Sequence, residues 1–223
     1  MSVILELAVF NIASVEVAEQ NQVQRIELCR NYAAGGITPL MSDFIIARKL
    51  FSGKIFVMIR PRAGDYFYSP CEFTEMLNAV IQFKLAGADG FVSGFLSPDN
   101  NVDEEQTKLF VDACAPLPVT FHRAIDDCAN YEMAVKKVVA CGVKRILSTG
   151  VAATAFQGKE LLNRMQIKYA EKLIVVAGGA VRSSGLATFL DDSSITEIHS
   201  AAVMMQGSDV ADAGEVKMLM KLI

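Results

Sequence analysis

Short apolar runs rich in Val, Ile, Leu and Phe recur along the chain and alternate with longer amphipathic stretches. The centres of the runs lie about 22 to 35 residues apart, a spacing that accommodates one strand and one helix per unit. Because the runs are nearly continuous in apolar residues, they are typical of strands buried on both faces of a parallel sheet. Eight such runs are present, at residues 3–9, 25–29, 54–59, 90–94, 118–122, 145–149, 173–177 and 195–200.

The segments between the runs carry signals of helix ends. The sequence Ser-Pro-Cys-Glu at 69–72 combines a capping box with proline at the first helical position, and predicts that a helix starts there. Asp103 and Asn130 are expected to cap two further helices. Gly87 and Gly142 stand where helices are expected to end.

Eight strand and helix units without a linker predict an α/β protein, a single (β/α)8 TIM barrel that spans residues 1–223. An open doubly wound sheet is the alternative, although the chain lacks the G-x-G-x-x-G turn common in dinucleotide-binding open sheets. The barrel is favoured because polar residues occur late in most runs, where a barrel would gather them at one mouth. These residues are Glu6, Glu27, Arg60, Ser93, His122, Ser148 and His199.

Composition narrows the classes of function. The chain is 52% hydrophobic with a formal net charge of −4, so we expect no binding to nucleic acid or to an anionic membrane surface. It shows no signal peptide and no apolar run of membrane length, which predicts a cytoplasmic protein. The five cysteines form no C-x-x-C pair and are odd in number, as expected of reduced thiols.

The segment 59–65, Ile-Arg-Pro-Arg-Ala-Gly-Asp, follows the third run and is the densest group of charges at a strand end. Because side chains two apart on a strand face the same way, Arg60 and Arg62 are expected to emerge together and to grip a carboxylate or phosphate, aided by Arg123. Asp65 would brace one guanidinium. The alternative is that both arginines only form structural ion pairs.

His122 ends the fifth run, and alternation along 119–122 places its imidazole inside the predicted barrel. We expect His122 to act as a general acid or base, with Glu27 or Asp126 orienting it or accepting a proton. His199, the second histidine of the chain, occupies the same kind of position on the last run. Each histidine could instead be a satisfied polar group of the core.

Gly178 and Gly179 follow the seventh run, at the place where TIM barrels often bind phosphate. Bare backbone N–H groups and the start of a helix could hold an oxyanion there, together with the segment after His199. The two glycines could equally be an ordinary turn between strand and helix.

For metals, the sequence spacing shows neither a facial triad of histidine and carboxylate nor a cluster of histidine and cysteine. Cu(I) prefers thiolate and thioether ligands, and Cys29 at the end of the second run is the best-placed candidate.

Taken together, these motifs resemble the CutC family of copper-homeostasis proteins. The matching segments cover most of the chain in order, at 25–29, 35–39, 59–65, 101–103, 119–124, 147–150 and 197–200. The resemblance implies a TIM barrel, a cytoplasmic location, a homodimer and a role in copper handling. Family members often carry Cys two residues after the glutamate of the first strand, where this chain has Ala8, so a thiol pair with Cys29 is absent.

Three functions remain open from the sequence. The resemblance and Cys29 favour copper homeostasis through Cu(I) binding. The arginines beside His122 and Glu27 favour an enzyme or sensor for a small anionic metabolite, including a phosphorylated one. The third is a catalytically silent scaffold whose interior charges form a structural ion network.

Overall fold

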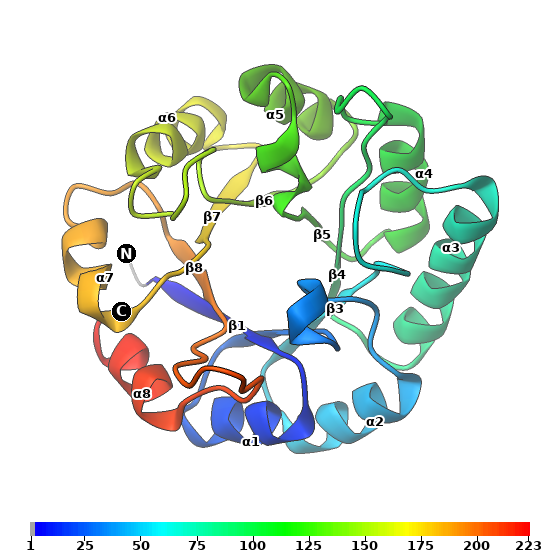
Figure 1. Ribbon diagram of the computed structural model, residues 1–223. Coiled ribbons are helices and arrows are strands. Elements are labelled where there is room, and N and C mark those ends of the chain that lie inside the picture. The colour runs from blue at the N-terminus through cyan, green and yellow to red at the C-terminus, as the bar shows by residue number, and fades with distance from the viewer. Residues whose placement is uncertain (1–2) are drawn as a thin grey trace.

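Eight parallel strands form a closed barrel in the order β1 to β8, and α-helices surround it (Figure 1). The computed structural model describes residues 3–223. The strands are Ile4–Val9 (β1), Arg25–Leu28 (β2), Lys54–Met58 (β3), Gly90–Ser93 (β4), Val119–Phe121 (β5), Arg145–Ser148 (β6), Ile174–Gly178 (β7) and Glu197–Ser200 (β8). The α-helices are Ile12–Gln20 (α1), Met41–Leu50 (α2), Pro70–Leu85 (α3), Glu104–Cys114 (α4), Tyr131–Ala140 (α5), Lys159–Tyr169 (α6), Ser183–Leu190 (α7) and Ala213–Lys221 (α8). Short 3-10 helices cover Tyr32–Ala34 (η1) and Arg123–Asp127 (η2).

The closure of the sheet confirms the predicted (β/α)8 barrel and excludes the open doubly wound sheet. The ring closes where β1 pairs with β8 in parallel, with Glu6 opposite His199. On the other edge of β1, Glu6 lies opposite Arg25 of β2. Each strand falls within or next to one of the eight apolar runs.

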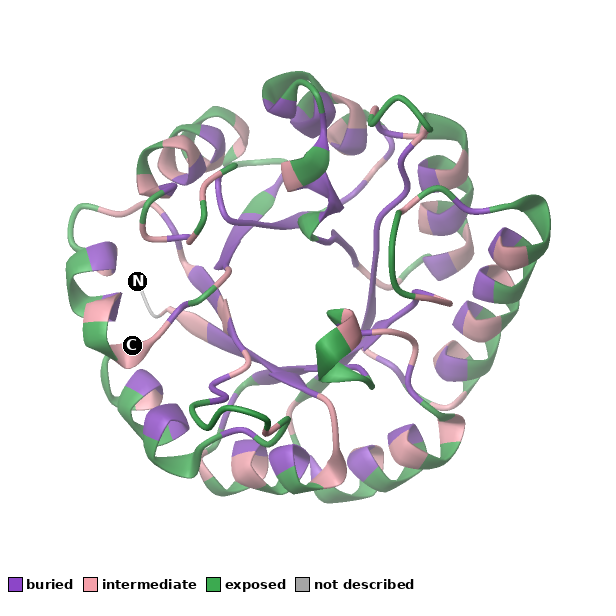
Figure 2. Ribbon diagram, viewed as in Figure 1, coloured by how far each residue is buried: buried purple, intermediate pink, exposed green. Residues whose placement is uncertain are grey.

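Alternation along each strand divides the buried residues into two sets. Leu5, Leu7 and Val9 of β1 belong to the main hydrophobic core, to which the helices also contribute. Glu6 and Ala8 alternate with them, and therefore face the barrel interior. Figure 2 shows the buried residues concentrated on the strands and on the inward faces of the helices. Most buried apolar side chains thus lie in the layer between sheet and helices, whereas most buried charged side chains lie in the barrel interior.

The helix ends follow the sequence signals. Ser69 forms the capping box with Glu72 at the start of α3, and Asp103 and Asn130 accept backbone N–H groups at the starts of α4 and α5. Gly87 and Gly142 follow α3 and α5 with φ of +99° and +90°, a backbone conformation that favours glycine. Among residues 3–223, no helix is both long and apolar enough to cross a membrane.

Candidate functional site

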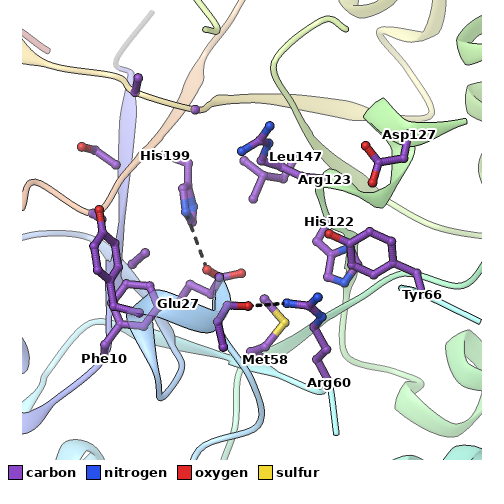
Figure 3. A pocket seen from close by; sticks show the side chains of 18 of the residues that line it. Phe10, Glu27, Met58, Arg60, Tyr66, His122, Arg123, Asp127, Leu147 and His199 are labelled. Carbon is purple, nitrogen blue, oxygen red and sulfur yellow. Dashed lines mark hydrogen bonds and ion pairs between the residues drawn. The ribbon is translucent and has the colours of Figure 1, made fainter. Parts of the chain in front are cut away.

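A cavity of about 490 Å³ opens where the carboxyl ends of the strands meet the following loops (Figure 3). It brings together six of the residues predicted from the sequence, namely Glu27, Arg60, His122, Arg123, Gly179 and His199. Its other polar lining includes Tyr32, Tyr66, Asp127 and Arg182, and its apolar lining includes Ala8, Phe10, Met58 and Leu147. These groups, which come from several different strand ends, therefore line a common cavity.

A network of four buried charges lies inside the barrel and supports the cavity. Arg25 Nε donates to Glu6 Oε2 at 2.5 Å, and Arg145 Nη2 lies 3.4 Å from the same oxygen. Both guanidiniums also pair with Glu197. Both guanidiniums also lie near the Phe56 ring, with Arg25 Cζ 5.1 Å and Arg145 Cζ 5.3 Å from its centre. Two carboxylates and two guanidiniums balance in charge, which makes their burial tolerable.

His199 connects this network to the cavity through two carboxylates. Its Nδ1 lies 2.9 Å from Glu6 Oε1, and its Nε2 lies 3.6 Å from Glu27 Oε2 (Figure 3). Burial disfavours protonation of His199, but Glu27 and Glu6 outweigh burial and raise its pKa.

The pKa values of the two carboxyl groups beside His199 are shifted in opposite directions. Burial raises the pKa of Glu27, and the nearby charge of Glu6 adds to that effect. Burial acts on Glu6 too, but Arg25, His199 and Arg145 together hold the pKa of Glu6 far below its usual range. Glu6 is therefore an anion at any ordinary pH. Glu27 is the carboxyl group of this pair that can gain or lose a proton beside His199.

His122 is held neutral by its surroundings. Its Nδ1 accepts the backbone N–H of Ala124 at 3.2 Å, which places the ring proton on Nε2. Burial and the nearby charge of Arg60 lower the pKa of His122 to about 3. The Tyr66 ring lies beside the imidazole (Figure 3), and the two ring centres are 4.9 Å apart. At neutral pH His122 therefore supplies a hydrogen-bond donor, which differs from the acid or base role expected from the sequence.

Arg60 enters the cavity while also holding two loops together. Its Nη1 donates to the carbonyls of Ala34 and Gly36 at 2.9 and 3.2 Å, and its Nη2 donates to that of Gly64 at 2.8 Å. Tyr66 covers the guanidinium, with Arg60 Cζ 4.9 Å from the ring centre. Arg60 is thus fixed in position by three of its five N–H groups, and Nε is among the donors that remain for a ligand.

Two further arginines line the opposite wall. Arg123 is 53% exposed, and its one ion pair, with Asp126, is long at 3.4 Å. Arg182 donates to the carbonyls of Val181 and Val203 at 2.8 and 3.0 Å. Gly179 lies near Arg123, with φ of +107°. These groups place positive charge beside the loop after β7.

The start of α7 differs from the expectation of an oxyanion site. The Glu215 carboxylate from α8 accepts the Ser183 backbone N–H at 2.7 Å and its hydroxyl at 2.7 Å. A carboxylate of the chain itself therefore occupies the helix N-terminus. Gly178 does not line the cavity, since its Cα faces Leu147 and His199, whose side chains a Cβ would meet.

Arg62 and Asp65 lie outside the cavity lining. Arg62 Nε donates to Glu72 at 2.6 Å, and its Nη2 lies 2.9 Å from Asp65. The expectation that Arg62 emerges beside Arg60 relied on strand alternation, but β3 ends at Met58. The structure therefore gives this pair the ion-pairing role that was the alternative reading of the sequence.

Asp126 also points away from the cavity lining and braces the loop after β6. It accepts the Ser148 hydroxyl at 2.5 Å and the Thr149 backbone N–H at 3.0 Å. Tyr131 in turn donates to Ser148 at 2.9 Å. These contacts give Asp126 a positioning role for the β6 loop, and its side chain does not line the cavity.

Cys29 lies below the cavity in a small apolar cluster with Phe56, Met58 and Val92. Its Sγ donates to Glu27 Oε2 at 3.5 Å. Burial raises the pKa of this thiol well above its usual range, and the charge of Glu27 adds to the shift. Among residues 3–223, no group of three His, Cys, Asp or Glu residues is arranged to hold a metal ion. Cu(I) binds thiolate, so Cys29 would have to lose its proton to serve as a copper ligand, and its raised pKa opposes that loss.

Sequence reasoning missed Arg25, Arg145, Glu197 and Arg182. The first three begin their strands, whereas the residues predicted to build the site come late in the runs. The signal was present, because alternation from Glu27 back to Arg25 puts both on the inner face. Arg182 follows the glycine turn after β7 and had no pattern that would distinguish it from a surface arginine.

Comparison with known proteins places this chain in a family. The family model described as "CutC family" matches residues 3–204. A relative from Chromobacterium violaceum, named as a family protein CutC, is 37% identical over 202 residues, which cover 91% of this chain and 82% of the relative. A human relative named "Copper homeostasis protein cutC homolog" is 35% identical over 199 residues, covering 89% of this chain and 73% of the relative.

Solved structures agree on the fold. CutC from Streptococcus agalactiae superimposes with a TM-score of 0.84 at 23% identity, covering 89% of this chain and 98% of that one. A thiamine phosphate pyrophosphorylase from Pyrococcus furiosus reaches a TM-score of 0.64 at 15% identity, covering 99% and 95% of the two chains. At these identities the likeness concerns the barrel alone. The family model and the relatives above 30% identity show that this chain belongs to the CutC family.

Proposed function

We propose that the chain binds a small anionic metabolite in the cavity at the mouth of the barrel. The observation that carries this proposal is the local charge of the lining, which holds three arginines, Arg60, Arg123 and Arg182, against two carboxylates, Glu27 and Asp127. The protein as a whole has a net charge of −4, so this excess of positive charge is a local feature. Guanidinium groups in a concave, partly desolvated site favour carboxylate or phosphate ligands.

The same cavity provides groups for proton transfer. Glu27 and His199 lie 3.6 Å apart, and the ionised Glu6 anchors the far side of the imidazole. A proton released by a ligand can pass to Glu27, and the adjacent His199 can change its own charge by binding or releasing a proton. His122 offers an N–H group to an oxygen on which negative charge develops. This arrangement supports an enzyme that moves protons, or a sensor that recognises the protonation state of its ligand.

The proposal is tested most cleanly at Arg123. This side chain is half exposed and has one long ion pair, so Arg123→Gln leaves the fold intact. Binding of inorganic phosphate, sulfate and small carboxylates to the full chain is measured by calorimetry. We expect about tenfold weaker binding in Arg123→Gln, the loss of one charge-assisted contact. The matched control is Arg164→Gln on α6, 61% exposed and outside the cavity. Equal affinities in both variants would contradict the proposal.

A role in copper homeostasis is the second candidate. It is favoured by the name of the human relative, and by the apolar cluster that brings the sulfur side chains of Cys29 and Met58 together beside the cavity, which Met58 lines. Titration of the protein with Cu(I) against a competing chelator tests this candidate. Direct binding at Cys29 predicts a lower affinity in Cys29→Ser and an unchanged affinity in the control Cys71→Ser, since Cys71 is exposed on α3. Equal affinities of the two variants would remove Cys29 as a ligand.

The homodimer and the cytoplasmic location stay predictions from the family resemblance. Sedimentation velocity of the full chain at several concentrations checks the first. Fractionation of the cells that produce the chain checks the second.

A further inference from the structure

Five buried side-chain nitrogen or oxygen atoms lack a hydrogen-bond partner among residues 3–223. Three of them belong to residues that line the cavity described above: Glu27 Oε1, Arg60 Nε and His122 Nε2. The three residues are 3%, 5% and 4% exposed, so bulk water does not satisfy them freely. Buried polar groups in native proteins are nearly always paired, and a concentration of unpaired ones in a cavity indicates a ligand that pairs them.

Two of the three atoms can only donate. Arg60 Nε carries a proton at any ordinary pH. His122 Nε2 carries the ring proton because Nδ1 already accepts the Ala124 backbone N–H. Three other N–H groups of Arg60 hold the carbonyls of Ala34, Gly36 and Gly64, so the guanidinium and its Nε keep their direction. The part of the ligand that meets this wall must therefore accept hydrogen bonds, as a carboxylate does.

The third atom, Glu27 Oε1, belongs to a different wall of the cavity and needs a different kind of hydrogen-bond partner. Glu27 Oε2 already contacts the Cys29 thiol and His199 Nε2, whereas Oε1 has no partner. An ionised Glu27 accepts a hydrogen bond at Oε1, and a protonated Glu27 can donate a hydrogen bond. A hydroxyl group satisfies either state, because it both donates and accepts.

Apolar side chains also line the cavity. Met58 lies between Glu27 and Arg60 in Figure 3, and Leu147 faces the same space. Neither side chain can hydrogen-bond usefully to a ligand. The stretch of ligand next to them is therefore carbon, which excludes a bare inorganic anion as the complete match.

We infer that the ligand is a small hydroxy acid, whose carboxylate accepts from Arg60 Nε and His122 Nε2 and whose hydroxyl pairs with Glu27 Oε1. This inference rests on the proposed function and narrows its class of ligand. A simple carboxylic acid of the same carbon skeleton leaves Glu27 Oε1 unpaired. A site that hydrogen-bonds a ligand hydroxyl rejects the analogue without it, since a buried polar group then stays unsatisfied.

Matched pairs of acids that differ by one hydroxyl test the inference. Glycolate with acetate, lactate with propanoate, and malate with succinate are titrated into the full chain by calorimetry. We expect at least one hydroxy acid to bind about 10- to 100-fold more tightly than its partner. The preference should disappear in Glu27→Leu, which removes the hydroxyl's partner, and should shrink in Glu27→Gln, which retains a polar end group. Glu132→Gln, on the surface of α5, is the control that keeps the preference.

The outcomes separate this inference from the proposed function. Equal affinities within all three pairs, with binding still weakened by Arg123→Gln, would overturn the hydroxy-acid inference and leave the anion site standing. A preference that persists in both Glu27 variants would also overturn it. If neither these acids nor inorganic phosphate bind, the proposed function fails together with the inference.

Discussion

The protonation state of His122 gives a sharp prediction about stability. In the folded chain its pKa is lowered to about 3 by burial and by the charge of Arg60. In the unfolded chain an exposed histidine has a pKa of about 6.5. Below that value the unfolded state binds a proton that the folded state refuses, so His122 destabilises the fold progressively as the pH falls from about 6.5 towards 3.

The size of the effect follows from the two pKa values. Between pH 7 and pH 5, the difference in proton binding amounts to about 2 kcal/mol of unfolding free energy. This figure is insensitive to the folded pKa, as long as that pKa lies well below 5. His122→Asn removes the titration while its side-chain oxygen can still accept the Ala124 N–H, which His122 accepts at present.

Urea unfolding of the wild type and of His122→Asn at pH 7 and pH 5 measures the effect. Other groups titrate in both proteins and cancel in the comparison, so the wild type should lose about 2 kcal/mol more than the variant. The contribution of His199 to stability depends on pH in the opposite direction. Its pKa is raised in the folded chain, so the stability that it contributes is lost as the pH rises through that pKa. An identical pH dependence in the wild type and His122→Asn would show that the imidazole is not held neutral.

Two further predictions concern the barrel interior and the loop after β7. Glu6→Gln leaves two buried guanidiniums with one carboxylate and should cost about 3–5 kcal/mol in urea unfolding, whereas the surface change Glu132→Gln should cost about 0–1 kcal/mol; similar losses would contradict a stabilising network. Gly207→Ala should lower the free energy of unfolding by about 1–2 kcal/mol, because Gly207 has a φ of +80° but an added Cβ meets nothing within 4 Å. Gly179→Ala should lower it by more, because Gly179 has a φ of +107° and the added Cβ would lie 2.4 Å from Thr149 Cγ2. Equal melting temperatures of the two glycine variants would show that the loop after β7 relaxes freely.

The fold was predictable because a barrel repeats one local pattern. Alternation along 119–122 assigned the His122 imidazole to the barrel interior, and the structure places His122 in the cavity lining. The cap at Ser69 was also local, since it involves residues three apart. Closure of the ring followed from the number of units, because eight strand and helix units are what a TIM barrel requires.

Features that depend on distant contacts were not predictable. Asp126 resembles an acid or base beside His122 in the sequence, yet its partners Ser148 and Thr149 lie on another strand and remove it from the cavity. The neutral state of His122 depends on burial and on one backbone N–H, neither of which a sequence shows. The predicted orientation of Arg62 assumed the alternation of side chains in a strand, but β3 ends at Met58, before Arg62.

The account depends on unpaired polar atoms at the barrel mouth being the contacts of one ligand. A crystal structure of the chain grown with the hydroxy acid that binds most tightly tests this directly. We predict that the ligand's carboxylate lies within hydrogen-bond distance of Arg60 Nε and His122 Nε2, and that its hydroxyl reaches Glu27 Oε1. An acid bound elsewhere on the protein, with these three atoms still without a ligand contact, would contradict the account.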